Sequence, residues 1–209
     1  MRVPAGRLHG LYVIVDPETA DPLPLAAAVI RGGARVLQLR DKRNPAGASL
    51  RLAEAIGEVA RRSGVLFIVN DRVDIALAAG ADGVHLGQHD LPVAAARAIA
   101  GDRLIIGCST NTVEEARRAV ADGADYLGVG AMFPTRSKSD TRPAGIARLR
   151  EIRAAVDLPI VAIGGITAAN AAEVVAAGAD MIAVISAIAS ASDPEMAART
   201  LAAVVEATR

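Results

Sequence analysis

The two lysines of this chain stand out, because the other 21 of its 23 basic residues are arginines. Lys42 follows the apolar segment VLQLR at 36–40, and Lys138 lies in a polar stretch that follows YLGVG at 126–130. Most of the scarce side-chain amides occur at or just after such segments: Gln38, Asn70, Gln88 and Asn111. Ammonium and amide groups at the ends of strands are typical of a site that binds an anionic small molecule. The alternative is that these residues lie in solvated loops and share no role.

Two aspartates come directly after neighbouring apolar segments and form a candidate metal site. Asp71 follows LFIVN at 66–70, and Asp90 closes the sequence GQHD after GVHL at 83–86. Two carboxylates on adjacent strand ends can share Mg²⁺, which keeps several waters and takes substrate phosphate oxygens as further ligands. The alternative is that Asp90, which precedes Leu-Pro, caps the next helix.

A long polar stretch and two turns complete the candidate site. Residues 132–143 are rich in hydroxyl groups and cations, which suits a loop that binds an anionic substrate or covers it as a lid.

Gly164-Gly165 follows PIVAI, and Ser186 follows MIAVI. Glycines there let a phosphate approach backbone N–H groups, and the N-terminus of a following helix favours the same charge. The alternatives are a solvated surface loop and glycines that serve only a tight turn.

Eight short apolar segments alternate with segments of helical spacing, and this alternation predicts the fold. Several of the eight are apolar throughout, as in a parallel sheet covered on both faces: 11–15, 36–40, 66–70, 83–86, 104–107, 126–130, 159–163 and 181–185. Segments such as 50–62 and 112–123 have helical spacing. We therefore predict one α/β domain over residues 1–209, a (β/α)₈ TIM barrel with its active site at the C-terminal ends of the strands. A doubly wound sheet is the alternative.

A short repeat favours the barrel. Gly-Gly-Ala-Arg at 32–35 and Gly-Ala-Asp at 80–82, 123–125 and 178–180 precede every second apolar segment. A glycine just past a helix can take the left-handed conformation that ends the helix. The recurrence indicates a barrel built from paired strand–helix units.

Composition excludes several classes of protein. The chain is 52% hydrophobic and 22% charged, with a formal net charge of zero, which argues against disorder and against a nucleic-acid partner. No apolar stretch is long enough for a signal peptide or a membrane span. The single cysteine, Cys108, excludes an internal disulfide framework and fits a reducing compartment. We therefore expect a soluble cytoplasmic protein with no membrane partner, whose alanine-rich exterior allows packing as a homodimer.

Three further residues lie in or beside the predicted strands. His85 is interpreted as a packed barrel residue rather than a ligand, and Cys108 as a small apolar residue. Ser109 is expected to point into the barrel mouth, where its hydroxyl can hydrogen-bond a substrate.

Seven motifs, in order and over nearly the whole chain, resemble the thiamine phosphate synthase family: QLRDK (38–42), VNDR (69–72), GVHLGQHDLP (83–92), GCST (107–110), GVGAMFPTRSKSD (128–140), IGGI (163–166) and VISAI (184–188). The resemblance implies the (β/α)₈ barrel. It also implies coupling of 4-amino-2-methyl-5-(diphosphomethyl)pyrimidine with 4-methyl-5-(2-phosphoethyl)thiazole, giving thiamine phosphate and diphosphate.

The same resemblance implies roles for individual residues. Gln38, Leu39, Arg40, Asp41 and Lys42 would hold the pyrimidine diphosphate, together with Asn70. Asp71 and Asp90 would bind Mg²⁺. Ser109 and Lys138 would contact the pyrimidine substrate, and with Arg40 they are the candidate catalytic residues. The thiazole phosphate would lie against the remaining set: Thr135, Arg136, Ser137, Gly165, Ile185 and Ser186.

The chemistry of this reaction fits these residue types. Diphosphate leaves readily only when its developing charge is neutralised, and the remaining pyrimidine-methyl cation is attacked by the thiazole nitrogen. That nitrogen carries no proton, so no general base is required. Ala131, Asn111, Ser137 and Ala144 depart from the usual family pattern.

Three rival functions remain open on sequence alone. A thiazole tautomerase of the same superfamily needs a proton shuttle, and Asn111 stands where those relatives have a histidine; an amide does not exchange protons as imidazole does. An aldolase-type barrel would use one of the two lysines as a Schiff base. A non-catalytic ligand-binding module would keep the pocket without turnover.

Overall fold

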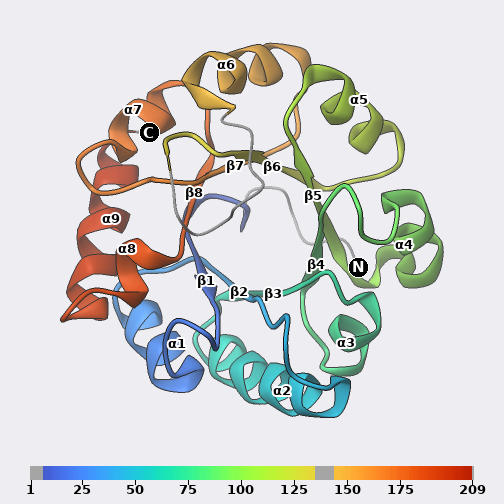
Figure 1. Ribbon diagram of the computed structural model, residues 1–209, viewed down its shortest axis with the longest axis vertical. Coiled ribbons are helices and arrows are strands. Elements are labelled where there is room, and N and C mark those ends of the chain that lie inside the picture. The colour runs from blue at the N-terminus through green and yellow to red at the C-terminus, as the bar shows by residue number, and fades with distance from the viewer. Residues whose placement is uncertain (1–6, 135–143, 209) are drawn as a thin grey trace.

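The computed structural model describes residues 7–134 and 144–208, which form a closed barrel of eight parallel strands inside a ring of helices (Figure 1). The strands follow the eight apolar segments closely: β1 (Gly10–Val15), β2 (Val36–Leu39), β3 (Leu66–Asn70), β4 (Gly83–Leu86), β5 (Ile105–Thr110), β6 (Tyr126–Gly130), β7 (Ile160–Ile163) and β8 (Met181–Val184). The predicted barrel is confirmed and the doubly wound sheet is excluded, because β1 pairs with both β2 and β8.

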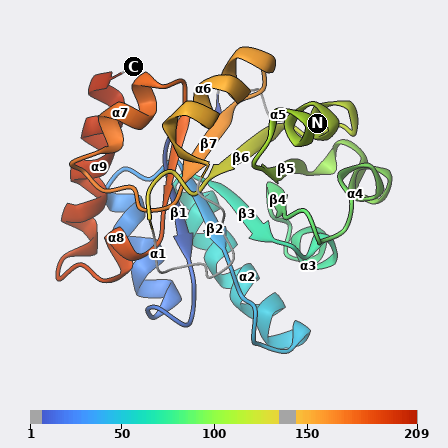
Figure 2. The ribbon, with the colours of Figure 1, turned by 45° about the horizontal axis from the view of Figure 1, so that its top comes forward.

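Helices alternate with these strands, and the tilted view in Figure 2 places them outside the barrel. Their bounds are as follows: α1 (Pro22–Arg31), α2 (Ala46–Arg62), α3 (Val73–Ala78), α4 (Val93–Ala100), η2 (Gly101–Arg103), α5 (Val113–Ala121), α6 (Gly145–Ala155), α7 (Ala171–Ala176), α8 (Ser186–Ala189) and α9 (Pro194–Thr208). Within the described residues, no helix has the length and apolar character needed to cross a membrane.

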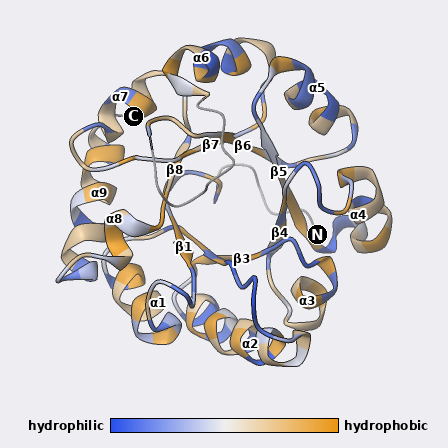
Figure 3. Ribbon diagram, in the orientation of Figure 1, coloured by the Kyte–Doolittle hydropathy of each residue, from blue (hydrophilic) through white to orange (hydrophobic). Residues whose placement is uncertain are grey.

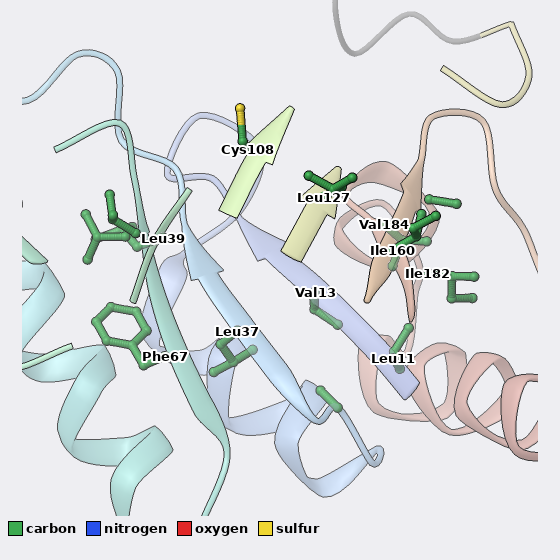
Figure 4. Close-up of a cluster of buried hydrophobic side chains, with 14 of the residues drawn as sticks. Leu11, Val13, Leu37, Leu39, Phe67, Cys108, Leu127, Ile160, Ile182 and Val184 are labelled. Atoms are coloured by element: carbon green, nitrogen blue, oxygen red, sulfur yellow. The ribbon is translucent and has the colours of Figure 1, made fainter. Parts of the chain in front are cut away.

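Side chains alternate between two apolar layers along each strand. Leu11 and Val13 of β1 belong to the larger cluster, between strands and helices, in which Phe67 and Cys108 also lie (Figure 4). Tyr12 belongs to the smaller cluster, which fills the barrel interior. Both faces of every strand are thereby buried, which explains why the strands read as nearly continuous apolar segments.

The Gly-Ala-Asp repeat joins strands in pairs at their N-terminal ends. The Asp82 backbone N–H donates to the Phe67 carbonyl at 2.9 Å, and its carboxylate accepts from the Phe67 N–H at 2.8 Å. Asp125 makes the same two bonds to Ile106, and Asp180 makes them to Ile160. The repeat therefore stabilises the barrel at the end opposite the predicted site.

Candidate functional site

The C-terminal ends of β2, β3 and β4 bring a lysine and two aspartates together. The Lys42 Nζ lies 2.8 Å from the Asp71 Oδ2. Asp90 is held by the Gly87 N–H, which donates to its Oδ2 at 2.7 Å. Asp90 thus organises the loop after β4 and does not cap α4, whose N-cap is Pro92. Figure 3 colours the segment that follows β2, which carries Lys42, strongly hydrophilic.

Asp71 has a positive backbone φ and a carboxyl group whose pKa is raised. Its φ is 63°, the one positive φ among the described residues other than glycine, and such outliers concentrate at functional sites. Burial, together with the neighbouring Asp90 carboxylate, raises the pKa of Asp71, although Lys42 opposes this rise. Burial acts in the same direction on Asp90, but its hydrogen bonds to Asp71 and to the Gly87 N–H lower its pKa overall. The two carboxyl groups therefore face one another.

This pair fits a divalent cation bound jointly with a ligand. Among residues 7–134 and 144–208, no group of three or more His, Cys, Asp or Glu side chains is arranged around a metal position. Mg²⁺ is commonly bound by one or two carboxylates, with water and substrate phosphates completing its shell. Two facing carboxylates of raised and lowered pKa supply that donor set, and a cation between them would relieve their repulsion.

Arg40 is held by a buried carboxylate below the mouth. Its Nη1 donates to the Asp16 Oδ2 at 2.5 Å, and Asp16 is only 4% exposed. Asp16 directly follows β1 and also accepts the Glu18 N–H at 2.9 Å. The guanidinium of Arg40, which directly follows β2, is therefore fixed by the residue after the neighbouring strand.

The other residues of the 38–42 segment have different surroundings. Leu39 is 1% exposed and packs in the layer between strands and helices, so its backbone alone is available to a ligand. The Asp41 carboxylate accepts hydrogen bonds from the Asn44 backbone and amide and from the Ser49 hydroxyl. Partial burial opposes ionisation of Asp41, but these bonds outweigh it and lower its pKa. Asp41 thus shapes the loop. Asn70 is the last residue of β3 and is half-buried.

A cavity of about 310 Å³ opens at the ends of β5 to β8. Figure 1 shows β6 and β7 on the side of the barrel opposite β2. Predicted residues from three parts of the chain line the cavity: Ser109, Gly165, Ile185 and Ser186. Asn111 lines it as well. Ser109 lies within β5, which ends at Thr110, three residues beyond the predicted segment 104–107, and Ser109 pairs with Gly128 of β6.

The glycine pair after β7 is required by close contacts. Gly164 and Gly165 have φ of 100° and 67°. A Cβ on Gly165 would lie 2.8 Å from the Phe133 Cβ, and one on Gly164 would lie 2.6 Å from the Ala131 Cβ. The Asn170 Nδ2 donates to the Gly165 carbonyl at 3.0 Å. This turn and the first residues of α8 line the cavity, where their backbone N–H groups can donate to a ligand.

Sequence reasoning missed a row of polar side chains beneath this cavity. Tyr12 and Tyr126 lie in the barrel interior with their hydroxyl oxygens 3.1 Å apart, and His85 lies 3.0 Å from the Tyr126 hydroxyl. The signal was present, since these are the two tyrosines of the chain. The same rarity that singled out the lysines applies to them. His85 is a barrel-interior residue, as interpreted from its place in the strand.

Four predicted site residues lie outside the described part of the chain: Thr135, Arg136, Ser137 and Lys138. The chain approaches them along β7, where the Met132 and Phe133 N–H groups donate to the carbonyls of Ile163 and Gly164. The described residues that precede Thr135 therefore lie at the rim of the cavity.

Comparisons with known proteins agree on one family. The family model described as thiamine monophosphate synthase matches residues 11–188. A thiamine-phosphate synthase of Methanoculleus marisnigri is 54% identical over 200 residues, which covers 92% of this chain and 93% of the relative. One from Moorella thermoacetica is 51% identical over 203 residues, which covers 95% and 97%.

Solved structures give the same result. The structure of thiamine phosphate pyrophosphorylase from Pyrococcus furiosus superimposes with a TM-score of 0.92 at 42% identity, covering 97% of this chain and 98% of that one. A 3-hexulose-6-phosphate synthase, 22% identical with a TM-score of 0.72, shares the fold alone.

Proposed function

This chain belongs to the thiamine monophosphate synthase family and has thiamine-phosphate synthase activity in thiamine biosynthesis, and we propose how its residues divide that reaction. The pyrimidine diphosphate binds at the ends of β2 to β4, and the thiazole phosphate binds in the cavity at the ends of β5 to β8. One observation carries this division: cationic side chains and paired carboxylates lie on one side of the mouth, and a glycine-lined cavity lies on the other. The diphosphate of the pyrimidine substrate matches the charged side, and the single phosphate of the thiazole substrate matches the glycine-lined cavity.

The β2 to β4 side suits a diphosphate leaving group. Lys42 and Arg40 supply positive charge, and Asp16 limits the positions that the Arg40 guanidinium can take. Asp71 and Asp90 would hold Mg²⁺, which supplies further neutralisation of the diphosphate when it is bound. Because Lys42 now pairs with Asp71, substrate binding would redirect its ammonium toward the phosphate oxygens.

The cavity suits the second substrate. Its backbone N–H groups near Gly165 and Ser186 are donors for a phosphate monoester. A phosphate anchored there directs the thiazole ring toward Ser109, which lines the same cavity. The residues thus act by positioning and by charge, since the attacking nitrogen carries no proton to remove. Arg136, Ser137, Thr135 and Lys138 remain predicted contacts from the segment after β6.

The test is coupling of the two purified substrates with and without Mg²⁺, with thiamine phosphate measured directly. We expect metal-dependent product and its loss in Asp71→Asn and Lys138→Ala. Asp74→Asn is a matched control, because Asp74 lies three residues from Asp71 but is exposed and paired with Arg72. Full activity of Asp71→Asn without any change in metal dependence would refute the proposed metal site. Homodimer formation is a separate prediction, to be measured by light scattering.

A further inference from the structure

Five polar side chains from five different strands form a continuous row through the barrel interior. The Gln38 Nε2 donates to the Tyr12 hydroxyl at 2.7 Å, which lies 3.1 Å from the Tyr126 hydroxyl. The row continues through His85, whose Nδ1 lies 3.0 Å from the Tyr126 hydroxyl and whose Nε2 lies 2.9 Å from the Ser109 Oγ. Ser109 lines the cavity, so the row ends at the substrate.

The Gln38 amide gives the donors and acceptors of this row one consistent direction. With Tyr12 accepting from Gln38, the Tyr12 proton points to Tyr126 and the Tyr126 proton points to the His85 Nδ1. Burial raises the pKa of both phenols above their ordinary value, so both remain protonated donors. A neutral imidazole that accepts at Nδ1 carries its proton on Nε2 and donates it to the Ser109 Oγ.

Two glycines make room for the rings of this row. A Cβ on Gly107 would lie 2.1 Å from the Tyr126 Cζ, and a Cβ on Gly128 would lie 2.9 Å from the His85 Cε1. Glycine inside a strand ordinarily weakens it, and it commonly marks a close approach of another group. The strands β5 and β6 therefore accommodate Tyr126 and His85 at a cost to their own regularity.

We propose that this row fixes Ser109 as a hydrogen-bond donor toward the substrate, with His85 and Tyr126 as positioning residues. Since the Ser109 oxygen accepts from His85, its own proton is directed away from His85, toward the cavity. The group that fits it is an acceptor lone pair, which the phosphate oxygens and ring nitrogens of the proposed substrates supply. A hydroxyl oriented before binding needs no reorganisation as charge develops, and preorganised donors contribute most to catalysis. This inference rests on the proposed function for its substrate, but not for the direction of the row.

The direction is measured on the ligand-free protein by ¹⁵N NMR with labelled histidine. The chain has three histidines, and the His85→Gln variant assigns the His85 signals by their loss. We expect His85 as the neutral tautomer with its proton on Nε2. A proton on Nδ1 would mean that the row runs in reverse and that Ser109 is an acceptor for the substrate, which would overturn the proposal.

The connection to Ser109 is measured by steady-state kinetics. Tyr126→Phe is expected to lower kcat/KM about five- to tenfold, as for one lost hydrogen bond. Tyr12→Phe removes an equally buried hydroxyl that does not touch His85, so we expect a smaller loss of about twofold. In a Ser109→Ala background, Tyr126→Phe should change the residual rate little. An equal loss in both backgrounds would refute action through Ser109. Absence of thiamine phosphate from the wild type would instead refute the proposed function and leave the tautomer result valid.

Discussion

Removing the charge of Asp16 tests whether this buried carboxylate holds Arg40 in place. Asp16→Asn keeps the shape of the side chain and an oxygen that can accept the Glu18 N–H. It removes the negative charge that lies 2.5 Å from the Arg40 Nη1, at a residue that is 4% exposed. The guanidinium, whose side chain is 20% exposed, would then be partly buried without a counter-charge.

The structure sets the size of the effect. Unit charges about 4 Å apart attract by about 4 kcal/mol at an effective dielectric constant of about 20. Desolvation of the two groups offsets part of this, and Arg40 retains some solvent. We therefore expect a coupling of about 2 kcal/mol, which corresponds to about thirtyfold in an equilibrium constant. A domain with about 5–15 kcal/mol of stability remains folded after such a loss.

The coupling is measured by urea denaturation of Asp16→Asn, Arg40→Gln and the double variant. The pair Arg148–Glu151 on α6 serves as a control, because its two side chains are 41% and 54% exposed and its coupling should be about 0.5 kcal/mol or less. A coupling for Asp16–Arg40 no larger than this control would show that the reasoning from burial is wrong.

The same variant has a kinetic consequence. If Arg40 binds the diphosphate, its loss of position in Asp16→Asn should lower kcat/KM for the pyrimidine substrate about tenfold, through KM more than kcat. An unchanged KM in a protein with the expected loss of stability would separate Arg40 from substrate binding.

Three further results are expected. Gly128→Ala should lower kcat/KM, because its Cβ would displace the His85 ring, and steady-state kinetics measure this. Mg²⁺ affinity, measured by calorimetry, should fall as the pH is lowered, and the fall should begin at a higher pH than for an ordinary aspartate, because burial and Asp90 raise the pKa of Asp71; Asp71→Asn should abolish this dependence. Burial raises the pKa of the Cys108 thiol to about 11, so alkylation followed by mass spectrometry at neutral pH should occur only after unfolding.

The fold was predictable because its determinants are local. Each of the eight strands is a short apolar segment, and Gly-Ala-Asp, or Gly-Ala-Arg before β2, precedes every second one. The Asp82 contacts explain why the repeat has this period: each aspartate binds the strand before its own, so one aspartate joins two strands. Such a pattern is visible in sequence because the residues of a unit lie within about one strand–helix length of each other.

The site was predictable where its residues follow strands directly, as Lys42 and Asp71 do. The row from Gln38 to Ser109 was not, because Tyr12 and Tyr126 are 114 positions apart and meet only after the barrel closes. Periodicity identifies a tyrosine in a strand as an interior residue but does not reveal its hydrogen-bond partner. The counterpart of Arg40 was missed for the same reason, since Asp16 comes from the neighbouring strand.

Barrel interiors are ordinarily filled by branched aliphatic side chains, and this chain uses them on most strands. Replacing them with a polar row is tolerated only when every member has a partner, and among the described residues no buried side-chain nitrogen or oxygen lacks one. Hydrogen-bond satisfaction alone does not explain the row, because Gly107 and Gly128 also leave space for the rings of Tyr126 and His85. The row begins at Gln38, a buried glutamine of β2 two residues before Arg40, and ends at Ser109, which lines the cavity. It therefore connects the two sides of the mouth that the proposed reaction must bring together.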